Sequence, residues 1–247
     1  MRFFLDISYD GSSFHGWQKQ PETTTIQGTI ENHLSILFQK PVLLTGAGRT
    51  DAGVHARQLI AHVDLDSPTN IEDLRHRLNS FLPNSIAINS IIPVKENAHA
   101  RFDALTRTYE YKINWNKNPF LIKYSYYLKH KLMIDPMNTA ASILLDYKDF
   151  KCFSKSKTDV KTYNCKIIKA EWIEKNGELI FFIKADRFLR NMVRAIVGTL
   201  LEIGTGKLNE ADFHTIIKSK DRSKAGFSVP AHGLYLKEIT YPKSIYL

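Results

Sequence analysis

Residues 45–58 (TGAGRTDAGVHARQ) gather side chains that could do chemistry into one short stretch of this sequence. These fourteen residues include three glycines, one carboxylate, two arginines and a histidine. The glycines, at positions 46, 48 and 53, allow sharp turns and close approach of a ligand because they carry no Cβ. Positive charge from Arg49 and Arg57, together with backbone N–H groups, would keep Asp51 ionised. The stretch therefore predicts a reactive carboxylate, Asp51, on a loop between two strands.

The same residues also fit a plain tight turn, because Gly, Thr and Asp are ordinary turn formers. On these residues alone the two interpretations stay open. A nucleotide-binding loop is excluded. After Gly46 and Gly48, Asp51 stands where a dinucleotide fingerprint has glycine, and the chain has no Gly-Lys-Ser/Thr of a phosphate loop.

Composition is typical of a globular protein with an anionic partner. The 247 residues, 43% of them hydrophobic, are enough for one large domain or two joined ones. The net charge of +9 and the pI of about 9.4 favour nucleic acid as the partner. The alternative is a merely basic protein from a lysine-rich proteome.

We expect a cytoplasmic protein with no membrane partner. No run approaches the roughly 20 apolar residues that crossing a bilayer requires. Residues 1–7 (MRFFLDI) are interpreted as a strand rather than a signal peptide, because an acid interrupts the apolar run. Cys152 and Cys165 have no metal-binding spacing and are expected to be free thiols in a reducing compartment.

The elements that would position Asp51 follow from hydrophobic periodicity. Residues 2–9 alternate as a strand, and an amphipathic helix begins at Ile26 behind Thr25 as its N-cap. In the loop between them, Phe14 and Trp17 are interpreted as anchors to the protein body rather than as aromatics that stack on bases. Further strands are expected at 42–44, 59–65 and 86–92, and a second helix at 70–81. This pattern predicts a largely antiparallel sheet with helices on one face.

Strands and helices also alternate in the second half of the chain. Arg107 and Tyr109 share one face of a strand expected at 106–115. The dipeptide Asn176-Gly177 predicts a hairpin between two strands. The other expected elements are strands at 123–128 and 234–241 and helices at 135–145, 186–203 and 209–219.

Basic residues gather on two segments of this half. The lysine-rich connection at 148–166 is expected to be a solvated loop with few anchors. In the helix expected at 186–203, Arg187, Arg190 and Arg194 stand at i, i+3 and i+7 and share one face. That face is either solvated or meets a buried carboxylate or an RNA backbone, and both interpretations stay open.

Seven short segments, spread in order over nearly the whole chain, carry a family resemblance. They are YDGSSFHGWQKQ (9–20), AGRTDAGVHA (47–56), FLP (81–83), HARF (99–102), RTYEY (107–111), NMVRAIVG (191–198) and GLYL (233–236). Each segment alone is a weak signal, but the combination is specific. The chain resembles the tRNA pseudouridine synthase A family.

The resemblance implies a fold and a reaction. The fold would be α+β, with two similar α/β halves, 1–104 and 105–247, that share a largely antiparallel central sheet with helices packed on it. The reaction would isomerise uridine to pseudouridine at positions 38, 39 and 40 in the anticodon stem-loop of tRNA. In it the uracil leaves its ribose, turns within the site and rejoins through C5. The family needs no metal and no cofactor, which fits the absence of metal-spaced His/Cys clusters here.

Matched residue by residue, the resemblance implies roles for five side chains. Asp51 falls at the catalytic aspartate, which acts as a nucleophile on the sugar or as a base. Arg194 falls at the basic residue that pairs with this aspartate, because a buried Asp without a partner would protonate. Tyr109 falls at the aromatic that stacks on uracil. Arg49 falls at the arginine that helps to flip the nucleotide out of its stack, a step that costs a few kcal/mol, and Arg107 is expected to bind substrate.

The resemblance further implies a homodimer that contacts the anticodon arm of tRNA with both subunits. Lys157 and Lys161 depart from the pattern, since arginines are expected there and lysine forgoes bidentate phosphate contacts. The alternative from another class is a non-catalytic protein that binds structured RNA on the same fold. A nucleic-acid hydrolase would need a second carboxylate or a metal cluster beside Asp51, and the nearest acids, Asp64 and Asp66, lie on a strand leading away from it.

Overall fold

The computed structural model describes residues 1–66, 70–156 and 160–247, so Lys157 lies outside the described residues. They form two compact units, Met1–Leu105 with Tyr235–Leu247, and Thr106–Leu234. The first unit includes the last residues of the chain, which we had grouped with the second half, because the final strand pairs with a strand of the first unit. The division into domains 1–104 and 105–247 stays a prediction.

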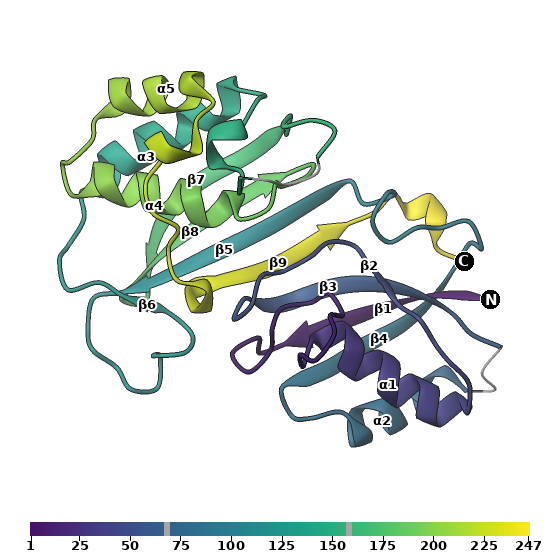
Figure 1. Ribbon diagram of the computed structural model, residues 1–247. Coiled ribbons are helices and arrows are strands. Elements are labelled where there is room, and N and C mark those ends of the chain that lie inside the picture. Colours follow the sequence, from purple (N-terminus) through teal and green to yellow (C-terminus); the bar gives the residue numbers. More distant parts are fainter. Residues whose placement is uncertain (67–69, 157–159) are drawn as a thin grey trace. The chain divides into compact units, whose positions relative to one another are not determined.

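The first unit is a mostly antiparallel sheet with two helices on one face (Figure 1). Its elements are β1 (Arg2–Tyr9), α1 (Ile26–Phe38), β2 (Thr45–Gly46), β3 (His55–Asp64), α2 (Ile71–Phe81), β4 (Ile86–Val94) and β9 (Leu234–Thr240). The strands stand in the order β4-β1-β3-β9, and β2 pairs with β3. Strand β1 is antiparallel to both of its neighbours, whereas β9 runs parallel to β3.

Helix α1 forms as its sequence predicts. The side chain of Thr25 caps the helix by accepting a hydrogen bond from the N–H of Gly28 at 3.2 Å. Ile26, Ile30 and Leu34 are fully buried along the face that packs on the sheet. The predicted N-cap is confirmed, and so is the predicted apolar stripe except at its last member, Leu37, which is partly exposed.

The prediction of a strand at 42–44 is wrong. Strand β3 begins at His55, earlier than the start predicted at residue 59. The N–H of Val42 donates to the side chain of Ser35, and that of Leu44 donates to the carboxylate of Glu31. Side chains of helix α1 thus satisfy backbone groups that a strand would pair with its neighbour. Only the two residues of β2 pair with β3, so the loop that carries Asp51 spans residues 47–54.

The second unit is a three-stranded antiparallel sheet with a short parallel strand at one edge. Its elements are β5 (Thr106–Asn114), β6 (Tyr126–Tyr127), α3 (Ile134–Ile143), β7 (Ile167–Lys175), β8 (Glu178–Ala185), α4 (Met192–Gly204) and α5 (Glu210–Ser219). The strands stand in the order β5-β8-β7, with β6 beside β5. The hairpin predicted at Asn176-Gly177 is confirmed, and both residues adopt positive φ, 55° and 77°. The expected strand at 123–128 shortens to β6.

Of the predictions about basic segments of the second unit, the helix start is wrong and the solvated connection holds in part. Helix α4 begins at Met192 rather than at 186, because Asn191 adopts a left-handed conformation with φ of 66°. Arg187 and Arg190 therefore precede the helix and share no helical face with Arg194. In the described part of the connection at 148–166 the lysines are exposed, as expected, but Phe150 and Phe153 are fully buried, so the segment has more anchors than expected.

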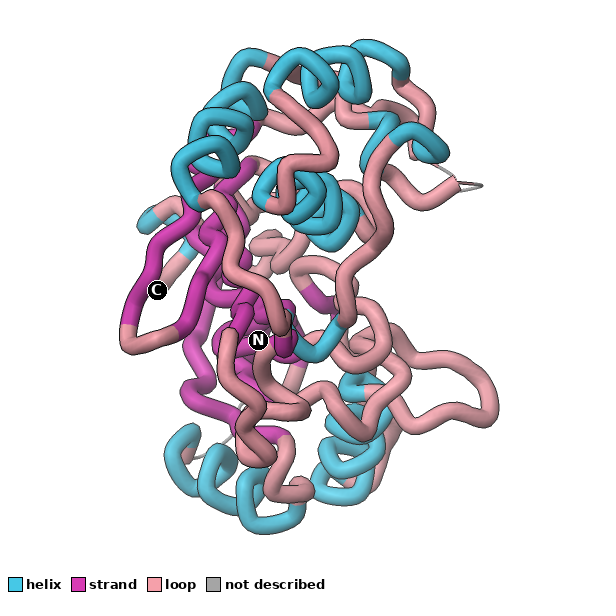
Figure 2. The backbone as a smooth tube through the Cα atoms, turned by 90° about the vertical axis from the view of Figure 1, so that its left-hand side faces the viewer, coloured by secondary structure: helices cyan, strands magenta, loops and turns pink. Residues whose placement is uncertain are grey.

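Within each unit the helices gather on one side of the strands, as Figures 1 and 2 show. The segregation of helices from a mostly antiparallel sheet defines an α+β fold, which confirms the predicted class. Among the helices of the described residues, none combines the length and the apolarity needed to cross a membrane.

Candidate active site

Asp51 lies in a tight turn that leads directly into β3. Its carbonyl accepts a hydrogen bond from the N–H of Val54 at 3.2 Å, and Gly53 within the turn has a φ of 77°. The side chain of Asp51 is partly exposed, while Thr50 before it and Val54 after it are buried. The tight-turn and reactive-carboxylate interpretations are therefore compatible, because the turn itself presents Asp51.

A second loop of the same unit supports this turn from behind. Trp17 donates its backbone N–H to the carbonyl of Thr50 at 3.2 Å, and the carbonyl of Phe14 accepts from Gly53 at 3.3 Å. Gly16 has a φ of 87°, and a Cβ there would stand 2.4 Å from the carbonyl oxygen of Thr50. Only glycine allows the two backbones to approach this closely. The exposed fractions of Phe14 and Trp17 are 7% and 1%, which confirms both as anchors.

Two buried polar contacts fix the ends of the turn. The hydroxyl of Tyr9 lies 2.8 Å from the hydroxyl of Thr50. At the other end, Nδ1 of His55 lies 3.1 Å from a carboxylate oxygen of Asp10 and 3.2 Å from the N–H of Gly11. A ring nitrogen donates or accepts, so it serves one of these two partners at a time. His55, at 2% exposure, therefore ties the preceding loop to β3.

The three glycines of the stretch have different roles, and only Gly53 has the expected role in a sharp turn. Gly53 alone of the three has a positive φ. A Cβ at Gly46 would stand 2.5 Å from the indole nitrogen of Trp17, so this glycine makes room for the anchor. A Cβ at Gly48 would meet nothing within 4 Å.

Arg49 stands two residues before Asp51 and is exposed. Its Nε donates a hydrogen bond to Oε1 of Gln18 at 3.1 Å. The arginine is thus tethered to the same loop that supports the Asp51 turn. Sequence reasoning missed Gln18, whose only signal was its place in the first of the seven segments.

Tyr109 and Arg107 lie on β5 of the second unit, and both are partly exposed. The ring of Tyr109 packs edge-to-face against Phe188, with centroids 5.2 Å apart and planes at 89°. The guanidinium of Arg107 donates to the carbonyl of Asp186 at 2.7 Å. Both contacts reach the segment that leads into α4.

Arg194 lies in the first turns of α4 and is held through its side chain. Its Nε donates to the carbonyl of Val229 at 2.7 Å, and the N–H of Val229 donates back to the carbonyl of Arg194 at 3.3 Å. A Cβ at Gly198 would stand 1.8 Å from the carbonyl oxygen of Phe227, so glycine is required where this segment crosses the helix. The segment around Val229 therefore sets the direction of the guanidinium.

The predicted site residues fall into two sets. Asp51 and Arg49 belong to the first unit, and Tyr109, Arg107 and Arg194 belong to the second. The side chains of Arg49, Tyr109, Arg107 and Arg194 each contact a residue of their own unit.

The two cysteines are unsuited to nucleophilic chemistry. Burial raises the pKa of the Cys152 and Cys165 thiols to about 12, so neither is a thiolate at neutral pH. Both cysteines are free, as expected. In the part of the chain that the structure describes, no group of three or more His, Cys, Asp or Glu side chains could hold a metal ion.

Comparison with known proteins identifies the family to which the chain belongs. The family model described as tRNA pseudouridine synthase matches residues 7–103 and 140–242. The chain belongs to this family, and pseudouridine synthases are isomerases.

Three relatives that align along nearly the whole chain share one name. A protein of Porphyromonas gingivalis named tRNA pseudouridine synthase A is 50% identical over 250 residues, covering 100% of this chain and 99% of the relative. Proteins with that name from Parabacteroides distasonis and Caldicellulosiruptor bescii are 50% and 40% identical. These two alignments cover 99% and 96% of this chain and 98% of each relative.

Proposed function

We propose that this chain converts uridine to pseudouridine in tRNA, at positions 38, 39 and 40 of the anticodon stem-loop. The observation that carries the proposal is the extent of the family match. It covers Asp51 in its first segment and Arg194 in its second, and relatives named tRNA pseudouridine synthase A align along the full chain. The net charge of +9 suits a polyanionic substrate.

In the proposed reaction Asp51 is the catalytic carboxylate. The bond between C1′ of the ribose and N1 of uracil breaks, the base turns, and C1′ bonds to C5. The proton on C5 is lost and N1 takes one up, so the reaction is an isomerisation. Asp51 either attacks the sugar or removes a proton from it, and both roles need the ionised carboxylate. Arg194 would pair with Asp51, because an opposite charge favours that form.

The other residues would bind the flipped nucleotide. Extruding a base from a stacked stem costs a few kcal/mol, and stacking on an aromatic returns roughly 1–3 kcal/mol. Tyr109, partly exposed and supported by Phe188, would provide that stacking surface. Arg49, exposed beside Asp51, would enter the space that the base leaves. Arg107 would contact the substrate from the same strand as Tyr109.

The chain would act without a metal or a cofactor, as a cytoplasmic homodimer whose two subunits both contact the anticodon arm. The reaction moves one base within one nucleotide and transfers no electrons. A carboxylate, an opposing cation and a stacking surface therefore supply the groups that it requires.

The test is to incubate the purified protein with an unmodified tRNA transcript in the presence of EDTA and to map pseudouridine. We expect pseudouridine at one or more of positions 38, 39 and 40. Product elsewhere would contradict the assigned positions. Tight tRNA binding without any product would instead support a non-catalytic RNA-binding protein.

A further inference from the structure

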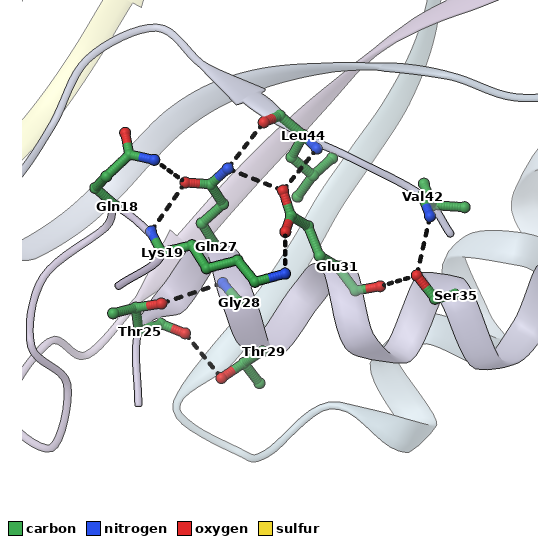
Figure 3. A network of polar contacts seen from close by, with 10 residues as sticks. All are labelled: Gln18, Lys19, Thr25, Gln27, Gly28, Thr29, Glu31, Ser35, Val42 and Leu44. Carbon is green, nitrogen blue, oxygen red and sulfur yellow. Dashed lines mark hydrogen bonds and ion pairs between the residues drawn. The ribbon is translucent and has the colours of Figure 1, made fainter. Parts of the chain in front are cut away.

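A polar network in the first unit links helix α1 to Gln18 and Lys19, in the loop before the helix, and to Leu44 after it (Figure 3). It is made by side chains of Gln18, Lys19, Gln27 and Glu31 together with the backbone of Leu44. The exposed fractions of Glu31 and Gln27 are 3% and 8%. Polar side chains buried to this degree require hydrogen-bond partners, and these find them in one another and in the backbone.

The carboxylate of Glu31 anchors the network. Its Oε1 accepts from the N–H of Leu44 at 2.9 Å and from Nε2 of Gln27 at 2.8 Å. Its Oε2 accepts from the ammonium of Lys19 at 3.1 Å. Because a carboxylate only accepts, Gln27 must turn its NH₂ group toward it.

Backbone groups fix the orientation of the Gln27 amide a second time. Its Nε2 also donates to the carbonyl of Leu44 at 3.0 Å, and its Oε1 accepts from the N–H of Lys19 at 3.1 Å. A carbonyl cannot donate and an N–H cannot accept, so a flipped amide would lose all of these contacts. Oε1 of Gln27 is therefore held as an acceptor toward Gln18.

This acceptor sets the orientation of Gln18. The NH₂ group of Gln18 donates to Oε1 of Gln27 at 2.8 Å, which leaves its own Oε1 to accept from Nε of Arg49 at 3.1 Å. Arginine has donors only. The sequence of donors and acceptors thus runs without conflict from the buried Glu31 through two amides to the exposed Arg49.

We propose that Gln18 is a positioning residue for Arg49, with Gln27 and Glu31 fixing its orientation from within the protein. This inference rests on the proposed function, which gives Arg49 the task of entering the RNA stack. An exposed arginine samples many rotamers, and each that points away from the stack delays extrusion of the base. A hydrogen bond at Nε restricts those rotamers and does not occupy the terminal nitrogens, which can then contact RNA.

The first experiment compares Gln18→Met with Gln20→Met as a matched control. Both glutamines lie on the same loop, and methionine keeps the length of the side chain while removing its hydrogen bonds. At Gln20 these are long bonds, at 3.3 and 3.4 Å, to the carbonyls of His15 and Gln18, and none of them reaches Arg49. Single-turnover pseudouridine formation is measured on a tRNA whose target uridine is paired, and on the same tRNA with that pair mismatched. A mismatched base leaves its stack at lower cost. We expect Gln18→Met to be about tenfold slower on the paired substrate, with a smaller defect on the mismatched one, and Gln20→Met to match the wild type.

The second experiment asks whether Gln18 acts through Arg49. In an Arg49→Met background, adding Gln18→Met should cause no further loss, because the side chain that it positions is already absent. Thermal unfolding of each variant reports its folding. An independent, multiplicative loss in the double variant would overturn the inference, as would a Gln18→Met defect of equal size on both substrates.

The wild-type reaction separates this inference from the function on which it rests. A wild type that forms no pseudouridine overturns the proposed function and the positioning role together. A wild type that forms product while Gln18→Met reacts at the same rate overturns the positioning role alone.

Discussion

Asp51 and Arg194, one in each unit, differ in the contacts described for them, which reach the backbone of the turn at Asp51 and both the backbone and the side chain at Arg194. At Asp51 the contacts fix the backbone, because Trp17 donates to the carbonyl of Thr50 and Gly16 packs against the same oxygen. At Arg194 the side chain itself is bonded, through Nε, to the carbonyl of Val229.

The difference follows from side-chain length. An aspartate is short, so a fixed backbone leaves its carboxylate few positions. An arginine has more rotatable bonds and loses more conformational entropy on ordering, so it needs a contact of its own near the guanidinium. Arg49 follows the same rule, since its Nε bonds to Gln18 although it stands only two residues from Asp51. If this rule holds, backbone changes should disturb Asp51 most and loss of side-chain contacts should disturb the arginines most.

The largest effect should come from Asp51→Asn. The amide keeps the shape of the side chain and cannot serve as a nucleophile or base, so turnover should fall by about 10³-fold or more. Affinity for tRNA should stay within a few fold of the wild type, because the backbone contacts of the turn are unchanged. Pseudouridine formation and tRNA binding, measured separately, check both parts. A large loss of binding would instead make Asp51 a structural residue of the turn.

Arg194 should tolerate a change that keeps its charge better than one that removes it. We expect Arg194→Gln to lower turnover by about 10²-fold and Arg194→Lys by roughly tenfold, because lysine keeps the charge but loses the bond from Nε. Single-turnover rates measure the two losses. Equal losses would show that the tether to Val229 matters more than the charge, which would sharpen the comparison with Asp51.

Gly16→Ala should disturb the Asp51 turn through the backbone alone. The new Cβ would need to move about 1 Å from the carbonyl of Thr50 to reach ordinary contact, and alanine is strained at this positive φ. We expect a loss of about 2 kcal/mol in the free energy of unfolding, which lowers the melting temperature by roughly 4–8 °C. Calorimetry measures the shift.

Gly48→Ala is the matched control, because a Cβ there meets nothing within 4 Å. Its melting temperature should stay near that of the wild type. Equal destabilisation by the two alanines would contradict a specific backbone contact at Gly16.

Local patterns were sufficient to predict most elements of this fold, because helix periodicity, the Thr25 cap and the Asn176-Gly177 turn act between residues close in sequence. The start of α4 was not predictable in this way. The apolar stripe continues upstream of Met192, and only the left-handed backbone of Asn191 stops the helix. Predictions based on one helical face therefore failed for Arg187 and Arg190.

The supports of the candidate site were harder to predict than its reactive residues. Asp51 stands out by type and by its glycine neighbours, whereas Gly16 and Gln18 act on residues more than thirty positions away. A glycine needed for a long-range backbone approach looks the same in sequence as one in an ordinary turn. The buried Glu31 is similarly hidden, since a single acid on an amphipathic helix is normally on its solvated face.

The smallest effect on turnover is expected from a change at His62, which lies on β3, the strand that follows the Asp51 turn. His62 of β3 is buried, accepts a hydrogen bond from the N–H of Ala100 at 3.1 Å, and packs against His99. Burial, followed by the positive charge of Arg2, lowers the pKa of His62 from 6.5 to about 4. Between these two values the unfolded chain binds a proton that the folded chain does not, so the free energy of unfolding should fall as pH decreases from about 6.5 to about 4.

His62→Asn tests this, because its side-chain oxygen can keep the bond to Ala100 without titrating. Its unfolding free energy should depend less on pH in this window, with a residual slope because burial also lowers the pKa of His99. Chemical denaturation at several pH values measures the slope, and an unchanged slope would contradict the assignment to His62. Turnover followed over the same window then separates two causes of acid inactivation. A loss that disappears in His62→Asn reports unfolding, whereas a loss that persists has a cause other than His62.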